Sequence, residues 1–289
     1  MRGRVVKGIG GFYFVRDDET GQVHMGKALG KFKRGKNILY VGDHVEYHLS
    51  DTGDSVITGV EKRINILSRP PVSNLDTLIV TFAAAEPEPS LITADKLCVG
   101  AEALGLEVII AITKRDKVTA GRLQELVDIY KDIYPVFTVD GMTGEGVDEI
   151  LEAIRGKSAA FAGQSGVGKS TMVNHLAGNG AAETGSISEK TGRGKHTTRH
   201  VEIFCLEGDT FLYDTPGFTS LDAPELNKKN VRDFFPEFRR YDGMCRYLDC
   251  VHRNEPECAV KEGLERGEIS QSRYGSYLQI MKEVSEWRR

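Results

Sequence analysis

The stretch that decides the fold is Gly163-Gln164-Ser165-Gly166-Val167-Gly168-Lys169-Ser170-Thr171. It follows the apolar run 158–162 and opens a helical pattern over 169–177, which is the strand–loop–helix setting that this glycine-rich motif requires. Glycines let the backbone curl so that successive N–H groups form a phosphate-sized nest, and the helix N-terminus adds partial positive charge. We therefore predict that these residues bind nucleotide phosphates, with Lys169 bridging the β- and γ-phosphates and Ser170 ligating Mg²⁺.

A second motif, Asp214-Thr215-Pro216-Gly217, ends the apolar pattern of 210–213. At the end of a strand, the Asp214 carboxylate lies at the carboxyl edge of the sheet, where it can hold Mg²⁺ through water. Gly217 is expected to offer its backbone N–H to the γ-phosphate. By itself the motif is a common turn, but its position after a strand and after the phosphate loop favours a nucleotide site.

The segment Thr113-Lys114-Arg115-Asp116 follows the apolar run 107–112 and matches the signature that reads guanine. Asp116 is expected to accept hydrogen bonds from guanine N1–H and the exocyclic amine, which adenine cannot supply, and the stem of Lys114 to lie across the base. Thr113 replaces the usual asparagine, so we expect the amide contacts that tie this loop to the phosphate loop to be lost. The alternative is an ordinary charged turn, but the preceding strand and the partner motifs favour guanine.

The order of these motifs is unusual. In the ordinary GTPase order the phosphate loop comes first and the guanine signature last, whereas here the guanine signature comes first. A fold cut after Asp-x-x-Gly and joined at its old ends has this order, and we expect the parts still to converge in space. Strand and helix patterns alternate from Leu75 onward, which predicts an α/β fold with a parallel sheet covered on both faces. The predicted domain is a circularly permuted P-loop GTPase.

A glycine-rich basic segment, 192–199, lies between the phosphate loop and Asp214, where a mobile switch belongs. Thr197 or Thr198 could close on Mg²⁺ and the γ-phosphate, and we assign Thr198 to the Mg²⁺ site together with Ser170 and Asp214.

The residue that positions the attacking water is not the usual one. Phe218 stands where many GTPases have a glutamine, and a phenyl ring cannot orient water. His196, inside the switch, is the best candidate, against the nearly equal alternative of a solvent-exposed or RNA-facing histidine. We predict that His196 and Lys169 are the catalytic residues.

Four potential metal ligands fall within fourteen residues: Cys245, Cys250, His252 and Cys258. Three thiolates and an imidazole suit tetrahedral Zn²⁺, and four protein ligands leave no open position, so one structural zinc ion is predicted. The alternative, unrelated thiols and a surface histidine, is disfavoured because four such residues in so short a span are improbable by chance.

Residues 1–70 contain short β-forming segments, such as 11–15, 37–41 and 44–49, separated by turns rich in Gly, Asp and Asn. Several short strands with basic loops predict an OB-type barrel of five strands, a shape that commonly holds oligonucleotides. Residues 1–72 carry 12 Lys and Arg against 8 Asp and Glu, although the net charge of the whole chain is −4. Five of these cations lie in a run that contains Phe32 and no acid: Lys27, Lys31, Lys33, Arg34 and Lys36.

This basic run suits the phosphate backbone of RNA. A charge run is usually only a solvated face, but the barrel and a second mixed patch favour an RNA surface. The second patch combines aromatic and basic residues: Phe234, Phe235, Phe238, Arg239, Arg240, Tyr241, Arg246 and Arg253.

The composition is ordinary for a globular protein, with 40% apolar and 28% charged residues in 289. There is no N-terminal apolar run that resembles a signal peptide, and no stretch approaches the ~18 apolar residues of a membrane span. Five cysteines, three of them crowded beside a histidine, indicate a reducing compartment. We therefore expect a cytoplasmic protein with no membrane partner. Because no coiled coil or long apolar seam is evident, we expect a monomer.

The permuted motif order, the N-terminal β-barrel and the Cys-x4-Cys-x-His-x5-Cys pattern together resemble the circularly permuted GTPases that depend on the small ribosomal subunit, the RsgA or YjeQ family. The resemblance covers essentially the whole chain. We accordingly divide it into an OB-type RNA-binding barrel over 1–70, a circularly permuted GTPase domain over 73–221 and a helical zinc-binding domain over 222–289, with a linker at 69–71.

The resemblance implies a bacterial GTPase that acts late in small-subunit maturation. Such a protein docks on the subunit and its rRNA in the GTP state, and hydrolysis to GDP, stimulated by the subunit, releases it. In the family, the switch histidine that matches His196 is implicated in hydrolysis in place of glutamine. Two departures from the family pattern bear on nucleotide affinity: Thr113 replaces asparagine, and Asp140-Gly141 stands where a Ser-Ala pair usually contacts guanine O6.

Two other functions fit parts of the sequence. A constitutive RNA-binding factor or chaperone would hold the nucleotide as a structural ligand, and its affinity for the subunit would not differ between GTP and GDP. A P-loop kinase would need an acceptor pocket and a lid, and the guanine signature and the Asp214–Gly217 motif argue against it. We predict a switch that hydrolyses GTP slowly when free and faster when docked on RNA.

Overall fold

The computed structural model describes residues 1–32, 38–51, 53–180, 201–215, 218–222, 226–227 and 229–286. The chain divides into two compact units, each built from three segments. The first consists of Met1–Thr77, Val147–Phe161 and Ser170–Phe218; the second consists of Leu78–Gly146, Ala162–Lys169 and Thr219–Arg289. The domain boundaries that the sequence motifs indicate, near 70 and 221, divide the chain by function and stay a prediction.

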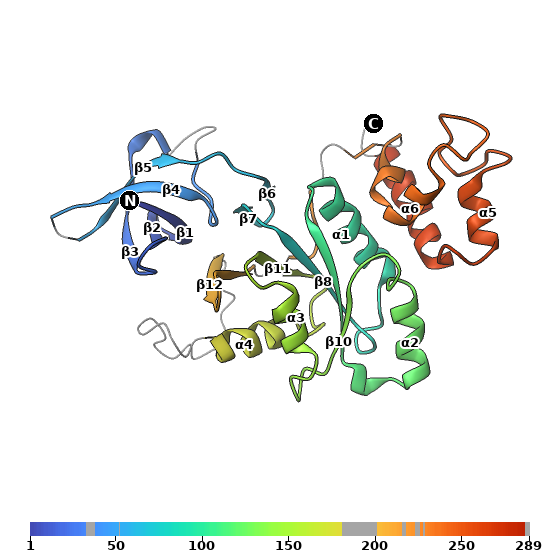
Figure 1. Cartoon of the computed structure of the whole chain (residues 1–289), viewed down its shortest axis with the longest axis horizontal. Coiled ribbons are helices and arrows are strands. Elements are labelled where there is room, and N and C mark those ends of the chain that lie inside the picture. Colours follow the sequence, from blue (N-terminus) through green and yellow to red (C-terminus); the bar gives the residue numbers. More distant parts are fainter. Residues whose placement is uncertain are drawn as a thin grey trace. The chain divides into compact units, whose positions relative to one another are not determined.

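A closed five-stranded barrel begins the first unit (Figure 1), as the sequence predicts. Its elements are β1 (Arg2–Ile9), β2 (Phe12–Asp17), β3 (Val23–Ala28), the 3₁₀ helix η1 (Gly30–Phe32), β4 (His44–Leu49) and β5 (Ser55–Val60). The pairs β1–β2, β2–β3, β4–β5 and β1–β4 are antiparallel, whereas β3 and β5 run parallel. Apolar side chains fill the interior: Val5, Val15, Ala28, Phe32, Leu39, Val45, Tyr47 and Ile57.

One sequence expectation for this region is wrong, and the segment predicted to be a linker has regular structure. Residues 38–41, which belong to a predicted strand, form only an isolated bridge from Val41 to Val72. The predicted linker at 69–71 is part of a small hairpin made by β6 (Ile66–Ser68) and β7 (Pro71–Ser73). Val41 pairs with a residue far away in the sequence, so a tertiary partner decides its conformation, whereas the hairpin pairs neighbouring segments.

The remaining elements of the first unit are α3 (Val147–Ala153), β11 (Ser158–Ala162), α4 (Lys169–Gly180), β12 (Glu202–Leu206) and β13 (Thr210–Asp214). Their sheet continues into the barrel, in the order β11-β13-β12-β1-β2-β3-β5-β4. β11 and β13 run parallel, and β12 is antiparallel to β13. β1 joins β12 through one register pair, Lys7 with Glu202.

The second unit contains β8 (Thr77–Ala83), α1 (Leu91–Ala103), β9 (Glu107–Thr113), η3 (Arg115–Lys117), α2 (Ala120–Asp128) and β10 (Val136–Val139). The strand order is β10-β9-β8, and β10 runs parallel to β9. β8 is buried along its whole length and β9 everywhere except at Glu107. Continuous apolar runs therefore identify strands that are covered on both faces, as predicted.

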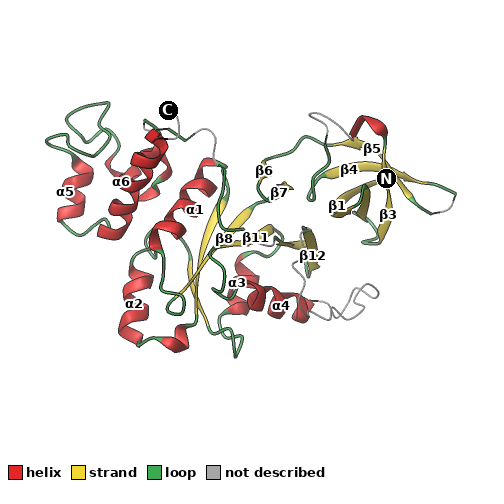
Figure 2. Ribbon diagram, turned by 180° about the vertical axis from the view of Figure 1, so that it is seen from behind, coloured by secondary structure: helices red, strands yellow, loops and turns green. Residues whose placement is uncertain are grey.

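The C-terminal part of the second unit is helical, with η4 (Val231–Phe234), η5 (Pro236–Tyr241), α5 (Ala259–Glu265) and α6 (Gln271–Glu286). Figure 2 shows α6 beside α1, and the two helices are in contact. Phe235, Phe238 and Tyr277 are at the centre of this region's core, with Phe235 and Phe238 stacked and Tyr277 edge-on to both. No helix among the described residues is long and apolar enough to cross a membrane.

Candidate nucleotide and metal sites

Glycine shapes the phosphate loop that follows β11. Gly163, Gly166 and Gly168 have φ angles of 153°, 79° and 96°, a region that residues with a Cβ disfavour. A Cβ at Gly163 would overlap the carbonyl oxygen of Thr81 on β8. The motif therefore requires glycine here for close packing as well as for the turn, and the structure places it directly after a fully buried strand.

Lys169 folds back over the phosphate loop. Its Nζ donates hydrogen bonds to the carbonyl oxygens of Gly163 at 2.7 Å and Gln164 at 2.6 Å. Burial disfavours the ammonium form and lowers the pKa of Lys169. Phosphate oxygens are stronger acceptors than carbonyls and carry the opposite charge, so the same donors are positioned to bind an anion. Ser170 and Thr171, the next residues of α4, are exposed.

Thr113 corrects one expectation from the sequence. Its side chain is buried at the end of β9, and its hydroxyl lies 2.5 Å from the carbonyl oxygen of Val167 in the phosphate loop. A second carbonyl, that of Phe82, lies 3.3 Å away. The tie between the base-reading loop and the phosphate loop is therefore kept, because a threonine hydroxyl donates to the backbone where an asparagine amide would.

The base-reading loop contacts two neighbouring loops of the second unit. Lys114 has a left-handed backbone, and its Nζ donates to the carbonyl oxygen of Glu86. Arg115 forms an ion pair with Glu145, from the loop after β10. Asp116 is exposed in η3, where its carboxylate is accessible to a base.

The Asp140-Gly141 segment forms a compact turn after β10. The Asp140 carboxylate accepts the backbone N–H of Met142 at 2.8 Å, and this bond lowers the pKa of Asp140. The backbone N–H of Gly144 bonds to the Asp140 carbonyl at 2.9 Å. Because β9 and β10 are parallel, with Thr113 opposite Val139, this turn and the base-reading loop leave the same edge of the sheet.

Asp214 is the last residue of β13 and is half-buried. The parallel pairing of β13 with β11 brings the end of β13 to the edge from which the phosphate loop leaves β11. Phe218 is 1% exposed and packs inside the protein, so it is not a water-orienting group. Four of the predicted site residues, His196, Thr197, Thr198 and Gly217, lie outside the described residues.

The predicted zinc ligands come together in the C-terminal region. The Nδ1 atom of His252 lies 3.5 Å from the sulfurs of Cys245 and Cys250 and 3.4 Å from that of Cys258, and all four ligand atoms lie within 4.8 Å of one another. Zn–S bonds of about 2.3 Å and Zn–N bonds of about 2.0 Å give tetrahedral edges of about 3.5–3.8 Å. The cluster therefore has the size and chemistry of a closed zinc site.

Neighbouring residues hold these ligands in place. The Glu255 carboxylate accepts the backbone N–H groups of Val251 at 3.0 Å, Arg253 at 2.7 Å and Asn254 at 2.9 Å, which folds the loop between His252 and Cys258. Tyr274 on α6 donates to the His252 carbonyl at 2.7 Å. Such outer contacts orient metal ligands, and the predicted ligand set gives no sign of them.

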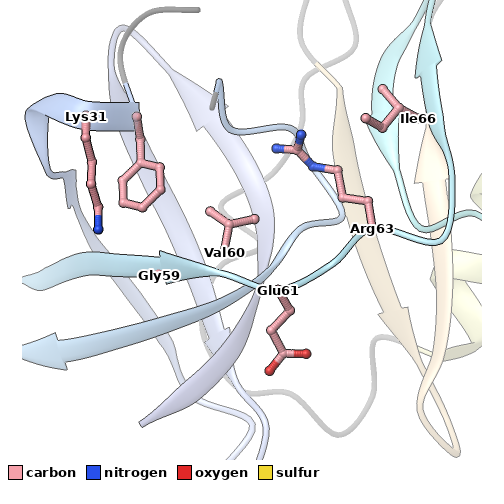
Figure 3. Close-up of a pocket in the computed structure, with 7 residues that line it drawn as sticks. Lys31, Gly59, Val60, Glu61, Arg63 and Ile66 are labelled. Atoms are coloured by element: carbon pink, nitrogen blue, oxygen red, sulfur yellow. The ribbon is translucent and has the colours of Figure 1, made fainter. Parts of the chain in front are cut away.

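A hollow of about 530 Å³ lies beside η1 and the end of β5 (Figure 3). Lys31 lines it, with its Nζ 4.8 Å from the Phe32 ring centroid, and has no ion pair among the described residues. Arg63 lines it too, but it bonds to the Asp43 carboxylate at 2.6 Å and lies over the Tyr40 ring. Of the basic run, Lys33, Arg34 and Lys36 lie outside the described residues.

The second patch predicted to bind RNA is wrong in its aromatic half. Phe235, Phe238 and Tyr241 are at most 5% exposed, because they form the core around η5 and α6, and the half-buried Phe234 packs against that core. The exposed apolar side chains lie instead in the loop between Cys245 and Cys250 and just before it: Met244, Tyr247 and Leu248. Sequence reasoning missed these three because isolated apolar residues between metal ligands resemble core positions.

Comparison with known families gives one consistent result. Residues 2–57 match the family described as RsgA N-terminal domain, and residues 60–224 match the one described as RsgA GTPase. The small ribosomal subunit biogenesis GTPase RsgA of Alkaliphilus metalliredigens is 40% identical over 291 residues, covering 100% of this chain and 99% of the relative. The protein of the same name from Agathobacter rectalis is 41% identical and covers 98% of each chain.

Two solved structures have the same fold. YjeQ from Thermotoga maritima superposes with a TM-score of 0.84 at 35% identity, covering 98% of each chain. YloQ, described as a circularly permuted GTPase, superposes with a TM-score of 0.82 at 30% identity, covering 100% of this chain and 96% of YloQ. The predicted circular permutation is confirmed.

Proposed function

The chain belongs to the RsgA GTPase family, and on that premise we propose that it is a GTPase of late small-subunit maturation. It binds the small ribosomal subunit and its rRNA in the GTP state, hydrolyses GTP to GDP and phosphate on subunit stimulation, and thereby drives its own release. The observation that carries the proposal is 40% identity over the full chain to a relative named for small-subunit biogenesis. Because the match runs the whole length, it includes the barrel, the phosphate loop and the zinc cluster together.

We assign phosphate binding to the loop backbone and to the first residues of α4: Gly163, Gln164, Ser165, Gly166, Val167, Gly168, Lys169, Ser170 and Thr171. The present contacts of Lys169 support this role, because both its acceptors are loop carbonyls that a phosphate can replace. GTPases of this family use Mg²⁺ with GTP, which neutralises phosphate charge when bound. Ser170, Thr198 and Asp214 are the proposed Mg²⁺ ligands, and Gly217 contacts the γ-phosphate.

The loop after β9 is the proposed guanine-binding element. The exposed carboxylate of Asp116 accepts the N1–H and the exocyclic amine of guanine, and Lys114 exchanges its bond to Glu86 for a position across the base. Thr113 supports the loop through Val167, and Arg115 braces it through Glu145. Specificity for GTP over ATP follows from the acceptor-only chemistry of an ionised carboxylate.

Hydrolysis is phosphoryl transfer to water, driven by positioning and charge stabilisation. Lys169 and the loop amides stabilise the charge on the transferred group, and His196 positions the attacking water. The buried ring of Phe218 supports this assignment, since the position that usually supplies a glutamine has no polar group to offer. If His196→Ala retained full subunit-stimulated hydrolysis, this role of His196 would be excluded.

The barrel and the C-terminal region are the proposed rRNA-docking parts. Lys27 and Lys31 on the barrel and the exposed Arg246 and Arg253 beside the metal cluster supply cations for phosphate contacts. One Zn²⁺ held by Cys245, Cys250, His252 and Cys258 has a structural role. The protein acts as a monomer in the cytoplasm, where its subunit partner is assembled.

The test is steady-state GTP hydrolysis with and without purified small subunits at fixed salt, with ATP as the control. The proposal expects GTP to be preferred and small subunits to stimulate hydrolysis strongly. It also expects tighter subunit binding with a non-hydrolysable GTP analogue than with GDP. Slow hydrolysis that subunits leave unchanged, with equal subunit affinity in both nucleotide states, would instead identify an RNA-binding factor whose nucleotide is a structural ligand.

A further inference from the structure

Strand β1 leaves the barrel part-way along its length. Its first residues, Arg2–Arg4, pair with β4, and a bulge follows between Val5 and Lys7. Beyond the bulge, Lys7 pairs with Phe14 of β2 on one side and with Glu202 of β12 on the other. Because a bulge re-aims a strand and its side chains, β1 passes here from the barrel to the sheet that carries Asp214.

Lys7 begins a line of three residues across three strands. It is the register partner of Glu202, and Glu202 is the register partner of Asp214. Directly opposed residues of antiparallel strands project to the same face, with Cα atoms about 4.5–5.5 Å apart. The Nζ of Lys7 bonds to the Glu202 carboxylate at 2.8 Å. A barrel side chain therefore holds the residue that lies directly beside Asp214.

The charges of these three residues give Lys7 an electrostatic role. Glu202 and Asp214 are two acids in directly opposed positions, an arrangement that is unfavourable by itself. Lys7 neutralises Glu202, and the exposed fractions of the two side chains, 27% and 39%, leave the pair only partly screened by solvent. Without the lysine, the field of Glu202 acts on Asp214.

Two arginines of the barrel contact β13 and its neighbour β11. The Arg4 guanidinium lies 4.2 Å from the centroid of the Phe211 ring and donates to the Ser158 hydroxyl at 2.8 Å. Arg16 lies 5.6 Å from the same ring. Phe211 is on β13, three residues before Asp214, and Ser158 begins β11. Cation–π contacts and a buried hydrogen bond therefore carry a displacement of β1 and β2 to the strand that ends at Asp214.

We propose that Lys7 and Glu202 are positioning residues through which the barrel sets the position of Asp214 and the electrostatic field that acts on its carboxylate. The inference rests on the proposed role of Asp214 at the Mg²⁺ site. Docking of the barrel on the subunit moves β1, the ion pair moves with it, and the carboxylate of Asp214 is brought into register for hydrolysis. Subunit stimulation is then transmitted through the sheet as well as through direct contacts of the nucleotide site.

The first test separates binding from transmission in the full-length protein. Lys7→Glu is expected to lower the maximal subunit-stimulated rate of GTP hydrolysis roughly tenfold, since an attraction becomes a repulsion. The subunit concentration that gives half of the maximum should not change. The charge swap Lys7→Glu/Glu202→Lys should recover most of the loss. Lys62→Glu is the matched control, an exposed barrel lysine with no ion pair among the described residues, and it should keep the maximal rate.

The second test needs no ribosomal subunits and reads binding instead of activity. It follows release of a fluorescent GDP analogue from the free protein as a function of Mg²⁺ concentration. Lys7→Glu leaves extra negative charge near Asp214 and should lower the Mg²⁺ concentration for half-maximal retention about threefold. Glu202→Lys places an ammonium opposite Asp214 and should raise it by a similar factor.

The outcomes separate this inference from the proposed function. Opposite shifts in Mg²⁺ dependence, with no subunit stimulation of the wild-type protein, would support the positioning role and refute the proposed function. Stimulation of the wild-type protein that Lys7→Glu leaves intact would overturn the inference alone. Equal shifts in both variants, or none, would also overturn it.

Discussion

Two buried arginines connect parts of the chain that are far apart in sequence, and their partners are of opposite kinds: Arg273 bonds to carboxylates, whereas Arg4 contacts neutral groups. In the C-terminal region, Arg273 is fully buried and bonds to two carboxylates, that of Asp95 on α1 at 2.7 Å and that of Glu237 on η5 at 2.7 and 3.0 Å. In the barrel, Arg4 is 7% exposed and contacts a hydroxyl, a histidine ring and a phenyl ring. Among the described residues no carboxylate lies within ion-pair distance of Arg4.

The difference in partners predicts a difference in rigidity. A buried cation between two buried carboxylates is held because every displacement leaves charge unpaired in a low-dielectric interior. The neutral partners of Arg4 impose no such penalty, so β1 can shift together with its neighbouring strands while the hydrogen bond to Ser158 and the contact with the Phe211 ring persist. The C-terminal region is therefore attached rigidly, whereas the attachment of the barrel is suited to transmit movement.

Removal of the metal is the strongest test of the rigid attachment. Structural zinc contributes roughly 10 kcal/mol to the folding of small zinc peptides, so Cys258→Ser or a strong chelator should unfold the C-terminal region. Limited proteolysis should then cut within 245–258 while leaving the barrel intact. Cys205→Ser, a cysteine outside the cluster, is the control. Unchanged cleavage after the metal is shown to have left would mean that the packing around Phe238 and Tyr277 suffices.

The buried charge cluster gives the next largest effect. Arg273→Met leaves Asp95 and Glu237 buried without their partner, and this should lower the free energy of unfolding by about 3–5 kcal/mol in urea. Arg239→Met is matched to it, because Arg239 also links η5 to α1, through Glu102, but with a side chain that is 56% exposed. That variant should lose less than about 1 kcal/mol. Equal losses in the two variants would show that burial does not set the strength of these links.

The two arginines are alike in one respect, because sequence reasoning finds neither of them. The zinc ligands and the phosphate loop are local sequence patterns. The structure brings the four predicted ligands together, with their ligand atoms within 4.8 Å of one another. Neither Arg4 nor Arg273 is marked by any motif, because their partners lie 154 and 178 residues away. Thr113 shows the same limit, since its bond to Val167 spans 54 residues and reverses the expectation drawn from its identity.

Secondary structure can likewise be predicted where a local pattern indicates it, but not where residues far away in the sequence decide it. Apolar runs that are buried on both faces identify β8, β9 and β11 from their sequence alone. The alternation of the barrel strand β1 is hidden in the sequence because the strand contains a bulge and carries charged residues, Arg4 and Lys7, that are buried or half-buried. Aromatic residues next to arginines in η5 suggest an RNA surface, but Phe235, Phe238 and Tyr241 belong to a core that they share with residues of α6.

Arg4 itself should show a smaller loss than Arg273. Arg4→Met removes the contacts with the Ser158 hydroxyl and the His44 ring and one cation–π contact, and it also removes a buried cation that has no carboxylate partner among the described residues. The expected loss in the free energy of unfolding is about 1–2 kcal/mol. Lys27→Met, which removes an exposed cation from the Phe12 ring, is the control and should change stability by less than about 0.5 kcal/mol. A loss for Arg4→Met as large as that for Arg273→Met would remove the contrast between the two attachments.

The smallest expected change in the free energy of unfolding concerns one tyrosine hydroxyl in each region. In the barrel, the Tyr47 hydroxyl donates to the buried carboxylate of Asp17 at 2.6 Å, and this bond, followed by the backbone N–H of Thr20, lowers the pKa of Asp17 to about 2. In the C-terminal region, the Tyr241 hydroxyl donates to Glu268 at 2.6 Å, but Arg266 is the first cause of the lowered pKa of Glu268, also about 2.

A carboxylate with a lowered pKa stabilises the fold above its ordinary pKa and loses that contribution as the pH falls through the lowered value. Tyr47→Phe should therefore lower the free energy of unfolding by about 1 kcal/mol at neutral pH, and its difference from the wild-type protein should shrink as the pH falls from about 4 towards 2. Tyr241→Phe leaves Arg266 in place, so the acid dependence contributed by Glu268 should persist. Unfolding in urea across this pH range measures both differences. If the loss in Tyr47→Phe stayed constant down to pH 2, the hydroxyl would stabilise the barrel by packing alone, and Asp17 would not be the acid-sensitive group of the barrel.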